Sequence, residues 1–160
     1  MWRAYYRLLE FFGPLARLIF YWHNKIFAVR RVRVAILRPN GDILLVQNSI
    51  GDKKWSLPGG GAGRKETDRA AACREVYEEL HIRIAPSELK SLGVVTMNSY
   101  VAPLFAVRID QARADTIVAH RVEIRSWRWV APTNIPEGAQ KSVAHVSSLL
   151  STEVKVDRME

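Results

Sequence analysis

Three glutamates, Glu75, Glu78 and Glu79, lie close together in a segment of helical character. Residues three and four apart share one face of an α-helix, so the three carboxylates are expected on one side. Carboxylates this close repel one another unless a cation offsets them. Arg74 is one candidate cation. A divalent metal ion is a better one, because Mg²⁺ binds carboxylate oxygen and keeps water ligands for a phosphate substrate. A solvent-exposed acidic helix face is the alternative interpretation of these glutamates taken alone.

A glycine-rich turn at residues 58–61 precedes this helix and leaves backbone groups exposed beside the carboxylates. Glu66 lies where the expected helix begins and is a fourth carboxylate. Negative charge is stabilised at a helix N-terminus, so this position favours either a helix cap or a further metal ligand. The turn and the helix together are therefore the place where chemistry is expected.

The elements that would position these groups follow from the hydrophobic pattern. Apolar and β-branched runs predict strands at residues 32–37, 43–47, 92–96, 104–109 and 122–130, and a short extended piece at 55–57. A turn signal at residues 39–42 joins the first two strands as a hairpin. Helices are expected at residues 66–80 and 140–150, and residues 151–160 are expected to fray. Strands on both sides of one strong helix favour an α/β (α+β) sandwich with a mixed sheet.

The composition is that of one globular domain. The chain has 160 residues, of which 48% are apolar and 25% charged, and these values argue against disorder. Cys73 is the only cysteine, which excludes a disulfide framework and fits a cytoplasmic location. The net charge of +8 favours an anionic partner. Its uneven distribution weakens the case for one large nucleic-acid-binding face, and no stable nucleic-acid partner is expected.

The positive charge is concentrated at the N-terminus. Residues 1–31 hold six basic side chains against one acidic side chain. Residues 1–29 form an amphipathic helical pattern, which Gly13-Pro14 should kink or split. Its charges interrupt the apolar runs, so it is a poor membrane span and a poor signal peptide. Three interpretations remain open: a helix packed on its own domain, a homodimer or partner contact, and a peripheral membrane anchor.

The stretch from Gly60 to Ile82 resembles the box of the Nudix hydrolases, G-x5-E-x7-R-E-U-x-E-E-x-G-U, in which U is a bulky apolar residue. Eight of the nine fixed positions match, and His81 stands where that family has glycine. The glycine position follows the helix and often needs a positive φ, so histidine there is expected to cost about 1 kcal/mol. The resemblance implies a Nudix-type α/β/α sandwich over residues 30–150. The extension 1–29 and the tail 151–160 lie outside this domain.

The resemblance also implies roles for individual residues. The three glutamates at 75, 78 and 79 would bind Mg²⁺ or Mn²⁺, and Glu66 would join them through water. Gly60 would offer its carbonyl oxygen, and Arg74 would orient the glutamates by ion pairing. Glu123 precedes a late tryptophan, where many members carry a metal ligand or a catalytic base. An ordinary exposed strand residue is the alternative for Glu123.

The implied reaction is hydrolysis of a nucleoside diphosphate linked to another group, such as a dNTP, a dinucleoside polyphosphate or a nucleotide sugar. A metal-activated water would attack phosphorus while a glutamate accepts its proton. Dinucleoside polyphosphate hydrolases often carry a tyrosine at about the position of Tyr100, and Lys54 and Arg64 could attract phosphate. Trp127 and Trp129 should face one side of their strand, either in the core or stacked on a base. The other hypotheses are a non-catalytic nucleotide- or RNA-binding relative, and a module that acts through residues 1–29.

Overall fold

A computed structural model describes residues 30–49, 53–97, 100–120 and 123–156, the side chains of residues 151–156 excepted. The predictions for residues 1–29 and for the last four residues fall outside this part of the chain. The described strands are β1 (Arg33–Leu37), β2 (Ile43–Asn48), β3 (Trp55–Ser56), β4 (Lys90–Thr96), β5 (Val101–Arg108) and β6 (Ile124–Val130). The described helices are α2 (Asp68–Leu80), the 3₁₀ turn η1 (Pro86–Glu88), α3 (Gln111–Asp115) and α4 (Lys141–Val156).

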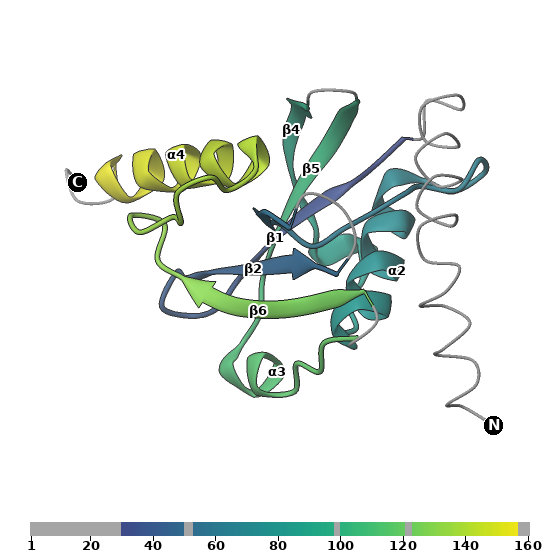
Figure 1. Cartoon of the computed structure of the whole chain (residues 1–160), viewed down its shortest axis with the longest axis horizontal. Coiled ribbons are helices and arrows are strands. Elements are labelled where there is room, and N and C mark those ends of the chain that lie inside the picture. The colour runs from purple at the N-terminus through teal and green to yellow at the C-terminus, as the bar shows by residue number, and fades with distance from the viewer. Residues whose placement is uncertain (1–29, 50–52, 98–99, 121–122, 157–160) are drawn as a thin grey trace.

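The strands form one mixed sheet, as the α/β (α+β) prediction required. Its order is β3-β2-β1-β5-β4, with β6 paired to β2. The central strand β1 runs parallel to β5, in register from Arg33 opposite Leu104 to Leu37 opposite Arg108. The other strand pairs are antiparallel. Helix α2 lies on one side of the sheet and α4 on the other, which gives the α/β/α sandwich (Figure 1).

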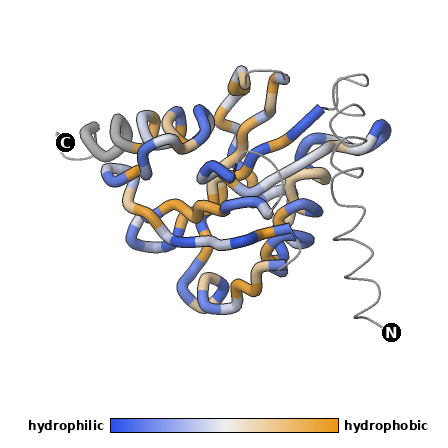
Figure 2. Tube along the Cα trace, in the orientation of Figure 1, coloured by the Kyte–Doolittle hydropathy of each residue, from blue (hydrophilic) through white to orange (hydrophobic). Residues whose placement is uncertain are grey.

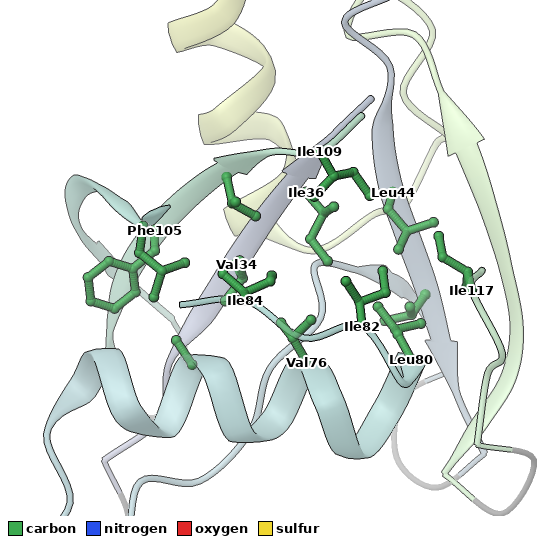
Figure 3. Packing of buried hydrophobic residues seen from close by; sticks show 14 of the residues in the cluster. Val34, Ile36, Leu44, Val76, Leu80, Ile82, Ile84, Phe105, Ile109 and Ile117 are labelled. Atoms are coloured by element: carbon green, nitrogen blue, oxygen red, sulfur yellow. The ribbon is translucent and has the colours of Figure 1, made fainter. Parts of the chain in front are cut away.

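Each face of the sheet has its own apolar core. Along β1, Val34 and Ile36 join the cluster against α2, whereas Ala35 joins the cluster against α4. This alternation follows from the two-residue period of a strand, and burial on both faces explains why β1 is a nearly continuous apolar run. Val76 and Leu80 of α2 point toward the first of these clusters (Figure 3). Apolar residues are concentrated along the central strands, whereas the outer loops are hydrophilic (Figure 2).

Helix α2 begins two residues later than the sequence pattern predicts. Its N-cap is Thr67, whose side-chain oxygen accepts a hydrogen bond from the Ala70 N–H at 3.2 Å. Glu66 therefore precedes the helix and does not cap it. A threonine hydroxyl that reaches the third backbone N–H satisfies a donor that the helix itself leaves unpaired.

The C-terminal end of α2 carries the histidine that replaces glycine in the box. His81 is the C-cap residue, with φ 58° and ψ 21°, and its N–H bonds the Tyr77 carbonyl at 2.9 Å. The positive φ expected at this position is confirmed. The ring of His81 lies within 2.9 Å of the Val118 carbonyl through Nδ1 and packs near the Tyr77 ring.

Other boundaries also differ from the predictions. Helix α4 continues to Val156, past the predicted end at residue 150, so residues 151–156 are helical and do not fray. Strand β5 begins at Val101, and the helices η1 and α3 are additional. The Asp110 carboxylate caps α3 by accepting a 2.7 Å hydrogen bond from the Arg113 N–H, a signal that the apolar pattern alone did not reveal.

The two late tryptophans face the same side of the sheet, as predicted. Trp127 pairs with Val46 and Trp129 with Leu44, and both partners belong to the core against α2. Trp129 packs on that core, whereas Trp127 is partly exposed. Core packing therefore accounts for Trp129. None of the helices among the described residues has the length and apolar character that a membrane crossing requires.

Candidate active site

Arg74 connects the acidic residues of α2 to the glycine turn. Its Nε and Nη2 bond the two carboxylate oxygens of Glu66, each at 2.9 Å. Its Nη1 bonds Glu75 at 2.9 Å and Glu78 at 2.8 Å, and Nη2 also bonds the Gly61 carbonyl at 2.8 Å. The guanidinium thus makes contacts of the kind that the predicted orienting role requires. A planar guanidinium with five N–H donors can bond both oxygens of Glu66 and still reach two further carboxylates and a carbonyl. A lysine ammonium, with three donors, cannot make all of these contacts.

Glu66 is held in the loop before α2 by opposite charge and by backbone. Besides its two bonds from Arg74, its carboxylate accepts a hydrogen bond from the Gly63 N–H at 2.9 Å. The Arg74 hydrogen bonds, assisted by the Gly63 N–H, lower the pKa of Glu66 to about 2. The carboxylate is therefore ionised at neutral pH and available to a cation.

The glycine turn passes directly over the glutamates. The Val32 N–H donates to the Gly60 carbonyl at 2.9 Å, so any ligand role of that carbonyl must use its second lone pair. A Cβ on Gly60 would lie 2.4 Å from a carboxylate oxygen of Glu75, so a larger residue there would displace the Glu75 carboxylate from its present position. The Gly59 N–H donates to the Glu79 carboxylate at 2.9 Å. This contact anchors the turn to α2.

Glu79 is the most deeply buried acidic side chain of the site, with 5% of its surface exposed. Burial raises its pKa to about 8, although the Gly59 hydrogen bond and the charge of Arg33 act in the opposite direction. The negative charges of Glu75 and Glu123 add to the increase. A buried carboxylate that faces other carboxylates is a group that a cation would stabilise.

Glu123, predicted from its place before a late tryptophan, lies close enough to act on the α2 glutamates. Its charge raises the pKa values of Glu75 and Glu79, although burial makes the largest contribution to both. Its backbone is fixed by a hydrogen bond from the Ser49 N–H to the Glu123 carbonyl at 2.8 Å. The side chain is exposed, just before β6. The fold thus brings residues from two distant parts of the chain to one site.

Arg33 was not identified from the sequence, yet it is part of this site. It is 3% exposed, its Nη1 donates to the Gly59 carbonyl, and its Nη2 bonds the Tyr100 hydroxyl at 3.1 Å. The Arg31 guanidinium lies over the Tyr100 ring, 5.3 Å from the ring centre. An arginine between two valines, at the start of an apolar run, is the signal that could have indicated this residue. Its partners, however, depend on how β1 and β5 are paired.

The remaining predicted substrate contacts lie at the edges of the site. Lys54 is exposed immediately before β3, and Arg64 is exposed in the loop between the glycine turn and α2. Their roles in attracting phosphate stay predictions. Tyr100 is partly buried immediately before β5, and its hydroxyl accepts a hydrogen bond from Arg33 Nη2.

The donor set of this site is compatible with a hard divalent cation. Every candidate ligand offers oxygen: the carboxylates of Glu66, Glu75, Glu78, Glu79 and Glu123, and the carbonyl of Gly60. Oxygen donors of this kind suit Mg²⁺ and Mn²⁺. Within the described residues, no group of three or more acidic, histidine or cysteine side chains is already arranged around a common point. The Arg74 guanidinium is bonded to three of the carboxylates instead.

The fold resembles those of several solved Nudix structures. A MutT NUDIX hydrolase from Burkholderia pseudomallei is 22% identical, with a TM-score of 0.62, over 75% of this chain and 95% of that one. An Ap4A hydrolase from C. elegans, solved as a binary complex, is 19% identical, with a TM-score of 0.63, over 82% of this chain and all of that one. A MutT protein from Methanosarcina mazei Go1 is 20% identical, with a TM-score of 0.62, over 79% of this chain and 95% of that one.

The sequence itself matches a family model. No curated protein matches the chain. The model of the NUDIX domain matches residues 28–150, most of the chain and close to the domain limits expected from the box. Residues 28–150 contain the glycine turn, α2 and Glu123. The chain therefore belongs to the Nudix hydrolase family.

Proposed function

We propose that this Nudix hydrolase cleaves the diphosphate of a nucleoside diphosphate linked to another group, and that the reaction depends on Mg²⁺ or Mn²⁺. The observation that carries the proposal is the acidic side of α2 beneath the glycine turn, where the Gly59 N–H meets the buried Glu79 carboxylate and Arg74 bonds Glu75 and Glu78. The negative charges of Glu75 and Glu123 add to the effect of burial, which is the main cause of the raised pKa of Glu79. Such a set is costly to fold without a cation, and it is typical of sites that bind one.

A bound divalent ion would neutralise diphosphate oxygens and increase the acidity of an attacking water. The chain's own residues would accept the proton of the attacking water and hold the metal ligands in place. Glu75 and Glu79 have raised pKa values and are candidates for accepting the proton of that water. Arg74 would keep Glu75 and Glu78 in place through its hydrogen bonds. Most of the rate increase would come from positioning and charge neutralisation, as in other phosphoryl transfers.

The substrate class includes dNTPs, dinucleoside polyphosphates and nucleotide sugars. Two observations favour testing dinucleoside polyphosphates early: the position of Tyr100 in the sequence and the similarity in fold to the C. elegans protein described as an Ap4A hydrolase. Lys54 and Arg64, exposed on either side of the glycine turn, would attract the phosphate chain by charge.

The test is product release from a panel of these compounds, with Mg²⁺, with Mn²⁺ and with chelator. Glu78→Gln and Glu79→Gln each replace a carboxylate by a neutral amide with little change of shape. We expect each to lower kcat/KM by about 100-fold or more, since each removes a proposed ligand. Glu88→Gln is the matched control. Glu88 lies on η1, forms an ion pair with Arg113 at 2.6 Å and has no proposed role in the site.

Turnover that needs metal, fails in both site variants and survives in the control would support the proposal. Turnover that survives chelation, or both substitutions, would contradict it. A wild-type protein that binds nucleotide with the same metal dependence and never turns it over would favour the non-catalytic alternative.

Residues 1–29 are proposed to add an attachment role in a cytoplasmic protein, through a peripheral membrane contact or a homodimer contact. The basic, amphipathic pattern of this segment supports the proposal. The junction with the domain lies beside the site: the Ala62 N–H donates to the Arg30 carbonyl at 2.7 Å, and the Arg30 guanidinium pairs with Asp68 at 3.1 Å.

A further inference from the structure

Arg33 places a positive charge where apolar residues would serve stability better. It lies in the central strand β1, between Val32 and Val34, which are fully buried. Its Nε is buried and has no hydrogen-bond partner within the part of the chain that the structure describes. A buried cation with an unsatisfied donor costs folding free energy, and an apolar residue of similar size is often at least as stable. Such placements are expected where a residue serves a site.

The contacts of Arg33 lead directly to Glu79. Arg33 donates to the Gly59 carbonyl, and the N–H of the same glycine donates to the Glu79 carboxylate at 2.9 Å. On the other side, the Tyr100 hydroxyl bonds Arg33 Nη2 at 3.1 Å. One residue of the turn is therefore held from both sides, by a buried cation through its carbonyl and by a buried carboxylate through its N–H.

Gly59 can take no other residue in this arrangement. Its φ is 128°, a conformation that L side chains rarely adopt, and an added Cβ would lie 2.3 Å from the Val32 carbonyl oxygen. The turn is thus pressed against β1 at this residue. The Val34 N–H holds the preceding peptide through the Pro58 carbonyl at 2.9 Å. Arg33 holds the following peptide through the Gly59 carbonyl, so the two contacts together fix the direction of the Gly59 N–H that meets Glu79.

We propose that Arg33 is a positioning residue, which fixes Gly59 through its carbonyl and thereby sets the orientation of the Glu79 carboxylate for cation binding and hydrolysis. The part of this inference that concerns hydrolysis rests on the proposed function, whereas the part that concerns cation binding is measured without substrate. Two donors of one planar guanidinium reach Gly59 and Tyr100 at once, in a fixed fork that a lysine ammonium does not reproduce. The proposal therefore requires the fork as well as the charge.

The experiment compares four variants of the full chain. Arg33→Met removes fork and charge, Arg33→Lys keeps the charge alone, and Tyr100→Phe removes the second anchor of the fork. Arg38→Met is the matched control, because Arg38 pairs with Asp42 just beyond the opposite end of β1. Each is titrated with Mn²⁺ alone, read by electron paramagnetic resonance, and assayed for kcat and KM on the substrate that the wild type turns over. Thermal unfolding reports stability separately.

For Arg33→Met, the weakening of Mn²⁺ binding and the fall in kcat are both expected to be about 10- to 100-fold, with little change in KM. Arg33→Lys should recover only part of either loss, Tyr100→Phe should show a smaller loss of Mn²⁺ affinity, and Arg38→Met should match the wild type.

Wild-type Mn²⁺ affinity and kcat in a folded Arg33→Met protein would overturn the proposal, as would full rescue by lysine or a rise in KM alone. If Arg33→Met does not fold, unchanged Mn²⁺ affinity in both Arg33→Lys and Tyr100→Phe overturns it instead. Because Mn²⁺ is titrated without substrate, a wild type that binds metal but hydrolyses nothing would contradict the proposed function alone. A wild type that binds no Mn²⁺ would contradict both.

Discussion

The Glu79 side chain has three features: deep burial, a hydrogen bond from the glycine turn, and proximity to other acidic groups. Its burial is almost complete, and the Gly59 N–H is its hydrogen-bond donor. The chemistry of Glu75, Glu78 and Glu79 could be anticipated because it depends on spacing along one helix. The part played by Arg33 could not, because it depends on the register of β1 against β5 and on a turn that folds back over β1.

The raised pKa of Glu79 predicts how the stability of the metal-free protein changes with pH. Its pKa is about 8 in the folded protein against a usual value of 4.5. Between these values the folded state binds more protons than the unfolded state, so stability falls as pH rises. We expect the free energy of unfolding, measured with urea and chelator, to be lower at pH 8 than at pH 5 by at least about 1 kcal/mol.

Glu79→Gln should remove much of this difference, whereas Glu88→Gln should retain it. The pKa of Glu88 is lowered, mainly by its hydrogen bond with Arg113, so its effect on stability lies below pH 4.5. Glu66 behaves in the same way. Because its pKa is about 2, its contribution to the free energy of unfolding is lost only as pH falls from 4.5 toward 2. Stability that rises from pH 5 to pH 8, or a Glu79→Gln protein with an unchanged slope, would contradict this interpretation.

At the scale of the element, α2 presents two functions on opposite faces. Ala72, Val76 and Leu80 pack on the sheet. On the other face, Arg74 bonds the Glu78 carboxylate and the Gly61 carbonyl of the glycine turn. The apolar pattern predicted the first face and the end of the helix. It misplaced the start by two residues, because the Thr67 side chain caps the helix, which therefore begins at Asp68. Local hydrogen bonds of this kind leave only a weak trace in hydrophobic periodicity.

The C-cap of α2 supports a prediction about stability. His81 has a positive φ, which costs a residue with a Cβ about 1 kcal/mol relative to glycine. We therefore expect His81→Gly to exceed His81→Ala by about 1 kcal/mol in free energy of unfolding, because both lose the imidazole ring and only alanine keeps the strain. Chemical denaturation of the two variants measures this difference. An alanine variant as stable as the glycine variant would show that the αL conformation of residue 81 is not retained.

At the scale of the whole molecule, the sandwich and its mixed sheet could be predicted from the sequence, but the strand order could not. The parallel pairing of β1 with β5 and the pairing of β6 with β2 join segments far apart in the chain. Neither leaves a local signature, because they are selected by burial on both faces of the sheet. Glu123 illustrates the consequence, since its place beside α2 depends on where β6 begins.

The division of the molecule predicts the behaviour of a truncated chain. Among the residues that the structure describes, both apolar clusters consist of residues from Val32 onward, and the family match begins at residue 28. A chain that begins at Arg30 is expected to keep its fold and its metal-dependent turnover while losing vesicle binding or dimerisation. Circular dichroism, turnover, vesicle sedimentation and sedimentation velocity measure these properties. An insoluble truncated chain would show that residues 1–29 complete the core, and attachment that survives truncation would assign it to the domain.

Strand β2 receives its partners at very different times during synthesis. Val46 pairs with Ser56 of β3 and with Trp127 of β6, so the two strands lie on opposite edges of β2. About 80 residues separate β2 from the end of β6, which at a translation rate of roughly 5–20 residues per second amounts to several seconds or more. During that interval one edge of an apolar strand has no partner strand, and Glu123 has not joined the site. A ribosome that stalls before residue 123 would therefore release a chain that is both inactive and open to edge-to-edge aggregation.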